Sequence, residues 1–284
     1  MKDIYLFLIL VPSVLIMNVI AYYIFIPDKY KYKKRKINET ISATTHKFSF
    51  LSEILPYLLL VAFAYIFVKS QWSIVTMLGI SQSYALANYI LDVEGNIVSL
   101  FQIIASPFLT YVSSFIYLLG FPFLLTFTFV ILLFTRQVKA LQEYAIAITI
   151  AYMLAFLFYT FTPVAVTGHT LPDVVPLLYN LSPIINDGLR SLDPFLNRCF
   201  PSLHAGLSFL AMLFIIFKTD LDNFKPIAIF ITIAIQFTIF YLGIHWILDF
   251  IAGVILAGLS FYTAEQVHKR ITNFQVSYGK KDEY

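Results

Sequence analysis

The sequence has few charged residues and a single cysteine. Asp, Glu, Lys and Arg make up 12% of its 284 residues, whereas 60% of them are hydrophobic. A soluble domain of this size could not bury so much apolar surface, so a soluble globular protein is excluded. Cys199 alone can form neither an internal disulfide nor a cysteine-based metal cluster, and it does not indicate a compartment. The composition predicts a protein that crosses a membrane several times.

A net charge of +3 gives no reason to expect a nucleic-acid partner. What the sequence does have is apolar runs near the roughly 20-residue length of a membrane-spanning helix. They predict an all-α bundle of about seven spans at residues 4–26, 50–69, 111–134, 143–163, 203–217, 226–242 and 244–264. Residues 97–109 are apolar too, but Pro107 and polar side chains interrupt them, which favours one interfacial or re-entrant helix.

The basic residues are distributed unevenly between the two sides of these spans. Fifteen of the 19 Lys and Arg fall on the side of residues 27–49 and the C-terminus. The positive-inside rule then predicts a protein of the cell membrane whose C-terminus is in the cytoplasm and whose N-terminus is outside. The basic segment 29–36 is expected to rest against anionic headgroups.

Three regions are expected along the chain. Residues 1–50 would be an N-terminal membrane anchor with a basic cytoplasmic loop, residues 51–265 a membrane-embedded catalytic domain, and residues 266–284 a cytoplasmic tail. The first apolar run is longer than the core of a signal peptide, and no cleavage site of small residues follows it, so a retained anchor is expected.

Two polar clusters lie at the edges of apolar runs, where ionisable groups are costly unless they pair or do chemistry. In the first, Ser202 follows a proline and precedes an apolar helix, as an N-cap residue does. The N–H groups and the positive dipole end of such a helix can bind phosphate. His204 falls in the first turn, where it could donate a proton to a leaving oxygen.

The second cluster contains His245 and Asp249, which are four residues apart and would share one face of a helix. A carboxylate that holds one ring nitrogen leaves the other as an oriented nucleophile. On the predicted topology both clusters face outside. Two histidines and an aspartate at one membrane face would form a site for phosphoryl transfer through a phosphohistidine. Each motif alone is more often a cap or a buried polar pair. A metal site of two histidines and an aspartate, with His169 as a further ligand, is a chemical alternative.

The segment Phe200-Pro201-Ser202-Leu203-His204 and the later His245-x-x-x-Asp249 resemble the second and third signature motifs of the type 2 phosphatidic-acid phosphatase superfamily, which includes vanadium haloperoxidases. Leu203, between the serine and the histidine, is typical of the inositol phosphorylceramide synthase-like subgroup of inositolphosphotransferases. Residues 159–164 and the acidic segment 92–94 also resemble this subgroup, so the resemblance extends from about Gln82 to Ala264.

The resemblance implies a six-helix phosphatase-like core to which the N-terminal span is added. It implies that His245 is the nucleophile, Asp249 its orienting partner, His204 the general acid and Ser202 a phosphate ligand. The substrate would be a lipid phosphate, phosphodiester or diphosphate, and the acceptor water, a polyol or a lipid alcohol. Neither a metal nor another cofactor is implied.

Two features of the family pattern are missing. Its first motif, Lys followed after six residues by Arg-Pro, has no counterpart in residues 162–169, and Thr238-Ile239 stand where the third motif has Ser-Arg. Another group must therefore bind the phosphate, and Arg198, four residues before Ser202, is the first candidate, with His169 the next. The missing cations also favour another function, a lipid transporter or lipid-binding protein on the same scaffold.

Overall fold

The computed structural model describes residues 4–28, 30 and 40–279, and the chain is all-helical within these ranges. They contain no strand, and one isolated parallel bridge joins Val164 to Arg198. Five helical stretches are long and apolar enough to cross a membrane, and two shorter apolar helices accompany them. The predicted all-α membrane bundle is confirmed.

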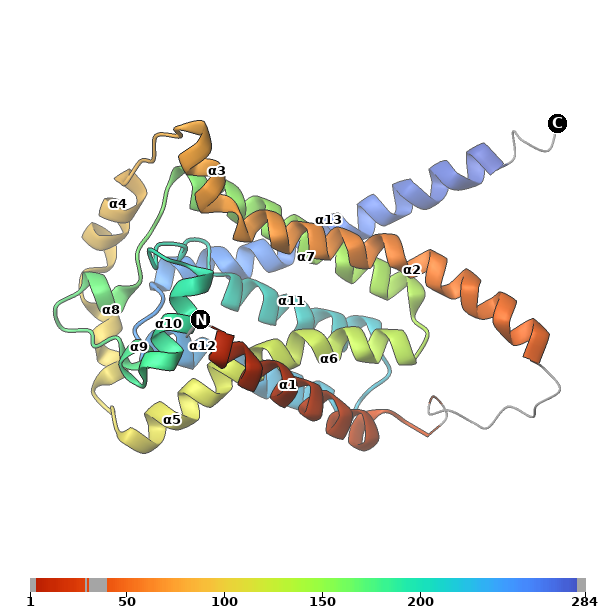
Figure 1. The fold of residues 1–284 in the computed structure, drawn as a ribbon, viewed down its shortest axis with the longest axis horizontal. Helices are drawn as coiled ribbons and strands as arrows, with labels where there is room; N and C mark the ends of the chain where they lie inside the picture. Colours follow the sequence, from red (N-terminus) through yellow and green to blue (C-terminus); the bar gives the residue numbers. More distant parts are fainter. Residues whose placement is uncertain (1–3, 29, 31–39, 280–284) are drawn as a thin grey trace.

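Seven helical stretches of the described chain run along the long axis of the bundle (Figure 1). In chain order they are α1 (Ile4–Phe25), α2 (Thr40–Lys69), α5 (Pro107–Phe115) with η3 (Ile116–Gly120) and α6 (Phe121–Phe134), α7 (Val138–Phe161), α11 (Leu203–Lys218), α12 (Lys225–Tyr241) and α13 (Ile247–Gly279). Helix α11 is central and contacts α6, α7, α12 and α13, whereas α1 and α2 pack against α6 and α7 respectively. The outward faces of α1 and α2 expose large apolar side chains, as lipid contact requires.

Short helices gather at one end of the bundle, where α1 also begins (Figure 1). They are α3 (Gln71–Leu78), α4 (Ala85–Glu94), η2 (Ile97–Gln102), α8 (Thr167–Thr170), α9 (Leu177–Asn180) and α10 (Pro183–Leu192). The connections from α6 to α7 and from α11 to α12 lie at the opposite end, as does the last part of α13. The start of α1 and the end of α13 therefore lie at opposite ends, in agreement with the predicted odd number of spans. Which end faces the cytoplasm stays a prediction.

The predicted interfacial helix at residues 97–109 is wrong in its extent. The 3₁₀ helix η2 stops at Gln102, and α5 begins at Pro107. Ser106 is the N-cap residue, and its hydroxyl accepts a hydrogen bond from the Leu109 N–H at 3.3 Å. Proline suits the first position of a helix because its missing N–H needs no partner there. Pro107 therefore starts a span that continues through η3 to Phe134 without a loop.

The other predicted region boundaries agree only partly with the helices of the structure. The basic segment 29–36 lies, apart from Tyr30, outside the described residues. Residues 266–279, expected to form a tail, continue α13 as one helix. The expected anchor α1 packs against both α6 and α10, so it is in contact with the bundle.

Helices α11 and α13 approach each other closely near their N-terminal ends. A Cβ added to Gly253 would lie 2.5 Å from the Ser202 carbonyl oxygen, and one added to Gly206 would lie 3.1 Å from the Gly253 carbonyl oxygen. At the same place the Ser202 N–H donates a hydrogen bond to the Asp249 carbonyl oxygen at 3.0 Å. Small residues allow such backbone contact between membrane helices. This packing brings the two polar clusters together.

Candidate active site

The first polar cluster forms the N-terminus of α11. Ser202 caps this helix as expected, because its hydroxyl accepts a hydrogen bond from the Ala205 N–H at 3.2 Å. His204 follows in the first turn, and its ring centroid lies 4.4 Å from that of Tyr117 and 4.5 Å from that of Phe121. Tyr117 belongs to the π-helical turn η3, a kind of distortion that is frequent at functional sites. These aromatic rings fix the position of the His204 ring.

The second cluster lies in the turn between α12 and α13. Because α13 begins at Ile247, His245 precedes the helix, and the prediction that it shares a helix with Asp249 is wrong. The chain turns at Gly243, whose φ of +73° is in the region that favours glycine. The expected contact is nevertheless made, with His245 Nδ1 3.2 Å from Asp249 Oδ2. The same oxygen accepts the Trp246 N–H at 3.1 Å, so Asp249 holds both the turn and the ring.

The two histidines face each other through their ring nitrogens. His245 Nε2 lies 3.4 Å from His204 Nδ1, and the ring centroids are 5.6 Å apart. His245 and Asp249 are buried, whereas His204 is only partly buried. When Nδ1 of His245 carries the proton donated to Asp249, the lone pair of Nε2 is free on the side of His204. One nitrogen can then act as a nucleophile beside another that can carry a proton.

A glutamate of α4 binds the N-terminus of α13. The Glu94 carboxylate accepts hydrogen bonds from the Ile247 N–H, at 2.8 Å, and from the Leu248 N–H. Burial raises the pKa of the Glu94 carboxyl, the two backbone hydrogen bonds lower it, and the charge of Asp249 raises it further. A carboxylate at this end of a helix is favoured by the helix dipole. Glu94 therefore helps to fix the first turn of the helix that carries Asp249.

Arg198 is held by acceptors of the protein itself. Its Nη1 donates to the carbonyl oxygens of Val68 at 3.4 Å and Leu192 at 3.3 Å, and its Nε lies 3.8 Å from the Asp193 carboxylate. Burial raises the pKa of the Asp193 carboxyl, while the Arg198 charge and backbone hydrogen bonds lower it. The Arg198 Nε is buried and has no hydrogen-bond partner. The guanidinium thus lies in the loop that leads to Ser202, with part of its hydrogen-bonding capacity unused.

His169 follows Gly168, whose N–H donates to the Gly243 carbonyl oxygen at 2.9 Å. It is exposed in α8, and its ring centroid is 5.4 Å from that of Tyr179. Burial of its ring and the charge of Arg190 lower its pKa, which favours the neutral form. In the described part of the chain it makes no hydrogen bond or ring contact with His204 or His245. Its expected role as a substrate or metal ligand has no support from a contact.

Cys199 also lies beside these residues, which no pattern in the sequence predicts. Its thiol donates to the Ile244 carbonyl oxygen at 3.4 Å. The sulfur, a ring nitrogen of His245 and a carboxylate oxygen of Asp249 lie within 4.8 Å of one another, and all three residues are buried. Asp249 Oδ1 has no hydrogen-bond partner. These donors could hold a metal ion, and they differ from the set of two histidines and an aspartate expected from the sequence.

Comparison with known families assigns the chain. The model of the PAP2 superfamily matches residues 87–263, which is more than half of the chain and contains Glu94, His204, His245 and Asp249. Comparisons with curated proteins and with solved structures give no match. With its histidines paired at the packed ends of α11 and α13, the chain belongs to the PAP2 superfamily.

Proposed function

We propose that this protein is an integral-membrane lipid phosphatase or phosphotransferase that acts through a phosphohistidine on His245. One observation carries the proposal: His245 Nε2 lies 3.4 Å from His204 Nδ1, while its Nδ1 contacts Asp249 at 3.2 Å. Membership of the PAP2 superfamily supports phosphatase-type chemistry. In this proposal the protein lies in the cell membrane, with its N-terminus outside and its C-terminus in the cytoplasm. The proposed site then faces outside.

The reaction has two half-reactions. First, His245 Nε2 attacks the phosphorus of a lipid phosphate, the nitrogen–phosphorus bond forms, and the bond to the leaving oxygen breaks. His204 gives its proton to that oxygen. Then water or an alcohol passes a proton to His204 and attacks phosphorus, and the nitrogen–phosphorus bond breaks. A contact of 3.4 Å leaves no room for an atom between the nitrogens, so the phosphoryl group has to separate the rings.

Charge stabilisation in this reaction rests on the N-terminus of α11 and on Arg198. The first turn of α11 offers N–H groups and a positive dipole end to the phosphoryl oxygens, beside the Ser202 hydroxyl. This partial charge is about half a unit, so a full cation is also needed. Arg198 is the nearest arginine in sequence, and its buried Nε is without a hydrogen-bond partner.

The phosphoryl acceptor distinguishes a phosphatase, which uses water, from a phosphotransferase, which uses an alcohol. The resemblance to inositolphosphotransferases favours transfer to a polyol or lipid alcohol over transfer to water. The test is to incubate purified protein with a panel of lipid phosphates, phosphodiesters and diphosphates, with and without polyols, and to measure free phosphate and new phospholipid. New phospholipid identifies a transferase and free phosphate a phosphatase. Neither product, with bound lipid retained, would instead indicate a lipid transporter or lipid-binding protein.

A metal-dependent reaction at the same residues is tested separately. The donors Cys199, His245 and Asp249 could hold an ion, whereas phosphohistidine chemistry needs none. We expect a strong chelator to leave turnover unchanged and Cys199→Ser to retain most of it, because serine can still donate to the Ile244 carbonyl. Activity lost on chelation and restored by one added metal, together with that metal in the purified protein, would contradict the phosphohistidine mechanism.

A further inference from the structure

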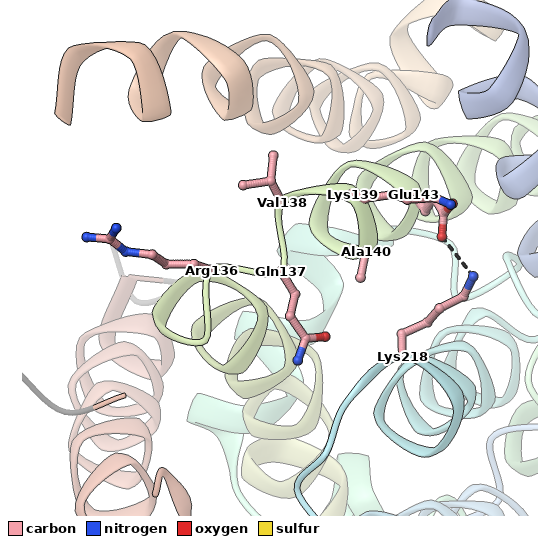
Figure 2. A pocket seen from close by; sticks show the side chains of 7 residues that line it. All are labelled: Arg136, Gln137, Val138, Lys139, Ala140, Glu143 and Lys218. Carbon is pink, nitrogen blue, oxygen red and sulfur yellow. Dashed lines mark ion pairs between the residues drawn. The ribbon is translucent and has the colours of Figure 1, made fainter. Parts of the chain in front are cut away.

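A second charged site lies at the end of the bundle opposite the histidine pair. A pocket of about 470 Å³ opens there, and Figure 2 shows the side chains that line it, which come from the α6–α7 connection, the start of α7 and the end of α11. Lys218 is the last residue of α11, 14 residues after His204, which places it about 21 Å away at roughly 1.5 Å per residue. The pocket is therefore separate from the proposed catalytic site.

The lining has an excess of positive charge. It contains Arg136, Lys139 and Lys218 but one carboxylate, that of Glu143. Lys218 pairs with Glu143 Oε2 at 2.9 Å, and this pair is drawn in Figure 2. Lys139 lies 3.8 Å from Glu143 Oε1 and is 62% exposed, and Arg136 makes no ion pair or hydrogen bond through its side chain with any described residue. Lys218 is thus neutralised, Lys139 is held by a longer contact, and the Arg136 side chain extends away from the other three charged groups in Figure 2.

Two further features point to a ligand. The pocket contains the first residues of α7, and its N-cap residue Gln137 makes no side-chain hydrogen bond to that helix, so the positive end of the dipole is not capped by a side chain. The Glu143 side chain is 1% exposed, and its Oε1 has no hydrogen-bond partner. A buried carboxylate oxygen of this kind is an acceptor for a hydroxyl or ammonium donor.

We propose that this pocket, which we call the basic-end pocket, binds the phosphate of an anionic glycerophospholipid whose headgroup also carries a hydroxyl donor. The phosphate lies at the N-terminus of α7 beside Lys139, the Arg136 side chain rotates inward from its orientation in Figure 2 to reach it, and the donor reaches Glu143 Oε1. The pocket lies between the ends of membrane-spanning helices, where the headgroups of the adjoining leaflet lie, and basic pockets in this position bind acidic headgroups. The bound lipid belongs to the scaffold and is not turned over there.

The test measures lipid retention, not catalysis. The full chain is placed in nanodiscs of phosphatidylcholine with a small fraction of phosphatidylglycerol, and lipids retained after release into detergent are identified by native mass spectrometry. The test variant is Arg136→Gln with Lys139→Gln. The matched control is Lys269→Gln with Arg270→Gln, which removes the same charge from the last part of α13, outside the pocket. Lys218 is left unchanged, because its loss would leave Glu143 buried without its partner.

We expect phosphatidylglycerol affinity to fall about tenfold or more in the test variant and to stay unchanged in the control. Phosphatidylmethanol, which has the same charge but no headgroup hydroxyl, should bind the wild type more weakly than phosphatidylglycerol. Equal retention by the wild type and the test variant would overturn the proposal. Displacement of the lipid by millimolar inorganic phosphate would overturn the lipid assignment in favour of a site for free phosphate.

Discussion

At the scale of single residues, the function rests on which nitrogen of each histidine is free. Asp249 accepts from the Trp246 N–H and contacts Nδ1 of His245, so only Nε2 of His245 is available for bond formation. The ring of His204 packs against two aromatic side chains and has, among the described residues, no carboxylate partner like that of His245. In the proposed mechanism these environments favour His245 as the nucleophile and His204 as the proton carrier.

The first prediction concerns this assignment. We expect His245→Ala to lower turnover on the order of 10⁴-fold while thermal unfolding changes little, because the covalent route is lost. His204→Ala should lose roughly 10² to 10⁴-fold with a lipid leaving group, and much less with an aryl phosphate whose leaving group needs no proton. Quenched-flow labelling with radioactive substrate followed by phosphopeptide mapping locates the intermediate. A phosphoryl group on His204 or on a serine would contradict the assignment.

The second prediction concerns Arg198. If its guanidinium binds phosphoryl oxygens, Arg198→Ala should lower kcat/KM on the order of 10²-fold, and Arg198→Lys should lose less, since it keeps the charge without the planar fork. Arg190→Ala is the matched control, because the Arg190 side chain is exposed and bonds to Asn186 and the Pro194 carbonyl. Steady-state kinetics are compared with thermal unfolding for each variant. A loss of stability with unchanged kcat/KM would leave Arg198 a structural role at Val68 and Leu192.

At the scale of helices, the site depends on how closely α11 and α13 approach. The Ser202 N–H donates to the Asp249 carbonyl, and Gly206 and Gly253 allow this contact. Glu94 holds the first turn of α13 from α4, so a short helix at the end of the bundle supports the helix that carries Asp249. Displacement of any of these elements would move His204 relative to His245.

The third prediction tests this packing. A methyl group at residue 253 would lie 2.5 Å from a backbone oxygen, which cannot move aside as a flexible side chain can. We expect Gly253→Ala to destabilise the protein by roughly 1–3 kcal/mol and to lower turnover, because the two histidines separate. Gly258→Ala on the same helix is the control: a Cβ there meets nothing within 4 Å, and stability should rise by roughly 0.5–1 kcal/mol. Similar thermal stability and activity of both variants would show that the close approach is not needed.

At the scale of the whole molecule, the two ends of the bundle have different chemistry. One end contains the short helices and the histidine pair, and the other contains the basic-end pocket, with Lys225 and its partner Asp222 close to the end of α11 in sequence (Figure 1). From the positive-inside rule we expect the basic end to be cytoplasmic. A lipid substrate for the histidines would then come from the outer leaflet.

The fourth prediction tests this orientation. Asp173 is exposed near α8, at the histidine end, and Asp222 is exposed between α11 and α12, at the basic end. We expect a membrane-impermeant thiol reagent to label Asp173→Cys in intact cells and Asp222→Cys only after permeabilisation. The native Cys199 is 2% exposed, so it should give little background. The reverse labelling pattern would invert the topology.

The sequence by itself determined the class of the protein, the positions of its apolar helical stretches and both polar clusters. These properties follow from local chemistry: apolar length sets a span, a serine before an apolar helix caps it, and a carboxylate four residues from a histidine can reach it. The start of α5 at Pro107 was also available from local rules, because proline is as typical of a first helical position as of an interruption.

Only the tertiary structure decided which groups meet at the site. Glu94 reaches a backbone N–H 153 residues away, Cys199 lies beside His245 and Asp249, and Tyr117 packs on His204. It also left His169 without a contact to either of these histidines and placed the Arg198 side chain among carbonyl oxygens. No spacing in the sequence encodes these contacts, because they depend on the approach and rotation of helices that are distant in the chain. The residues at a helix end set its local chemistry, and the packing of α11 against α13 decides which other groups these residues contact.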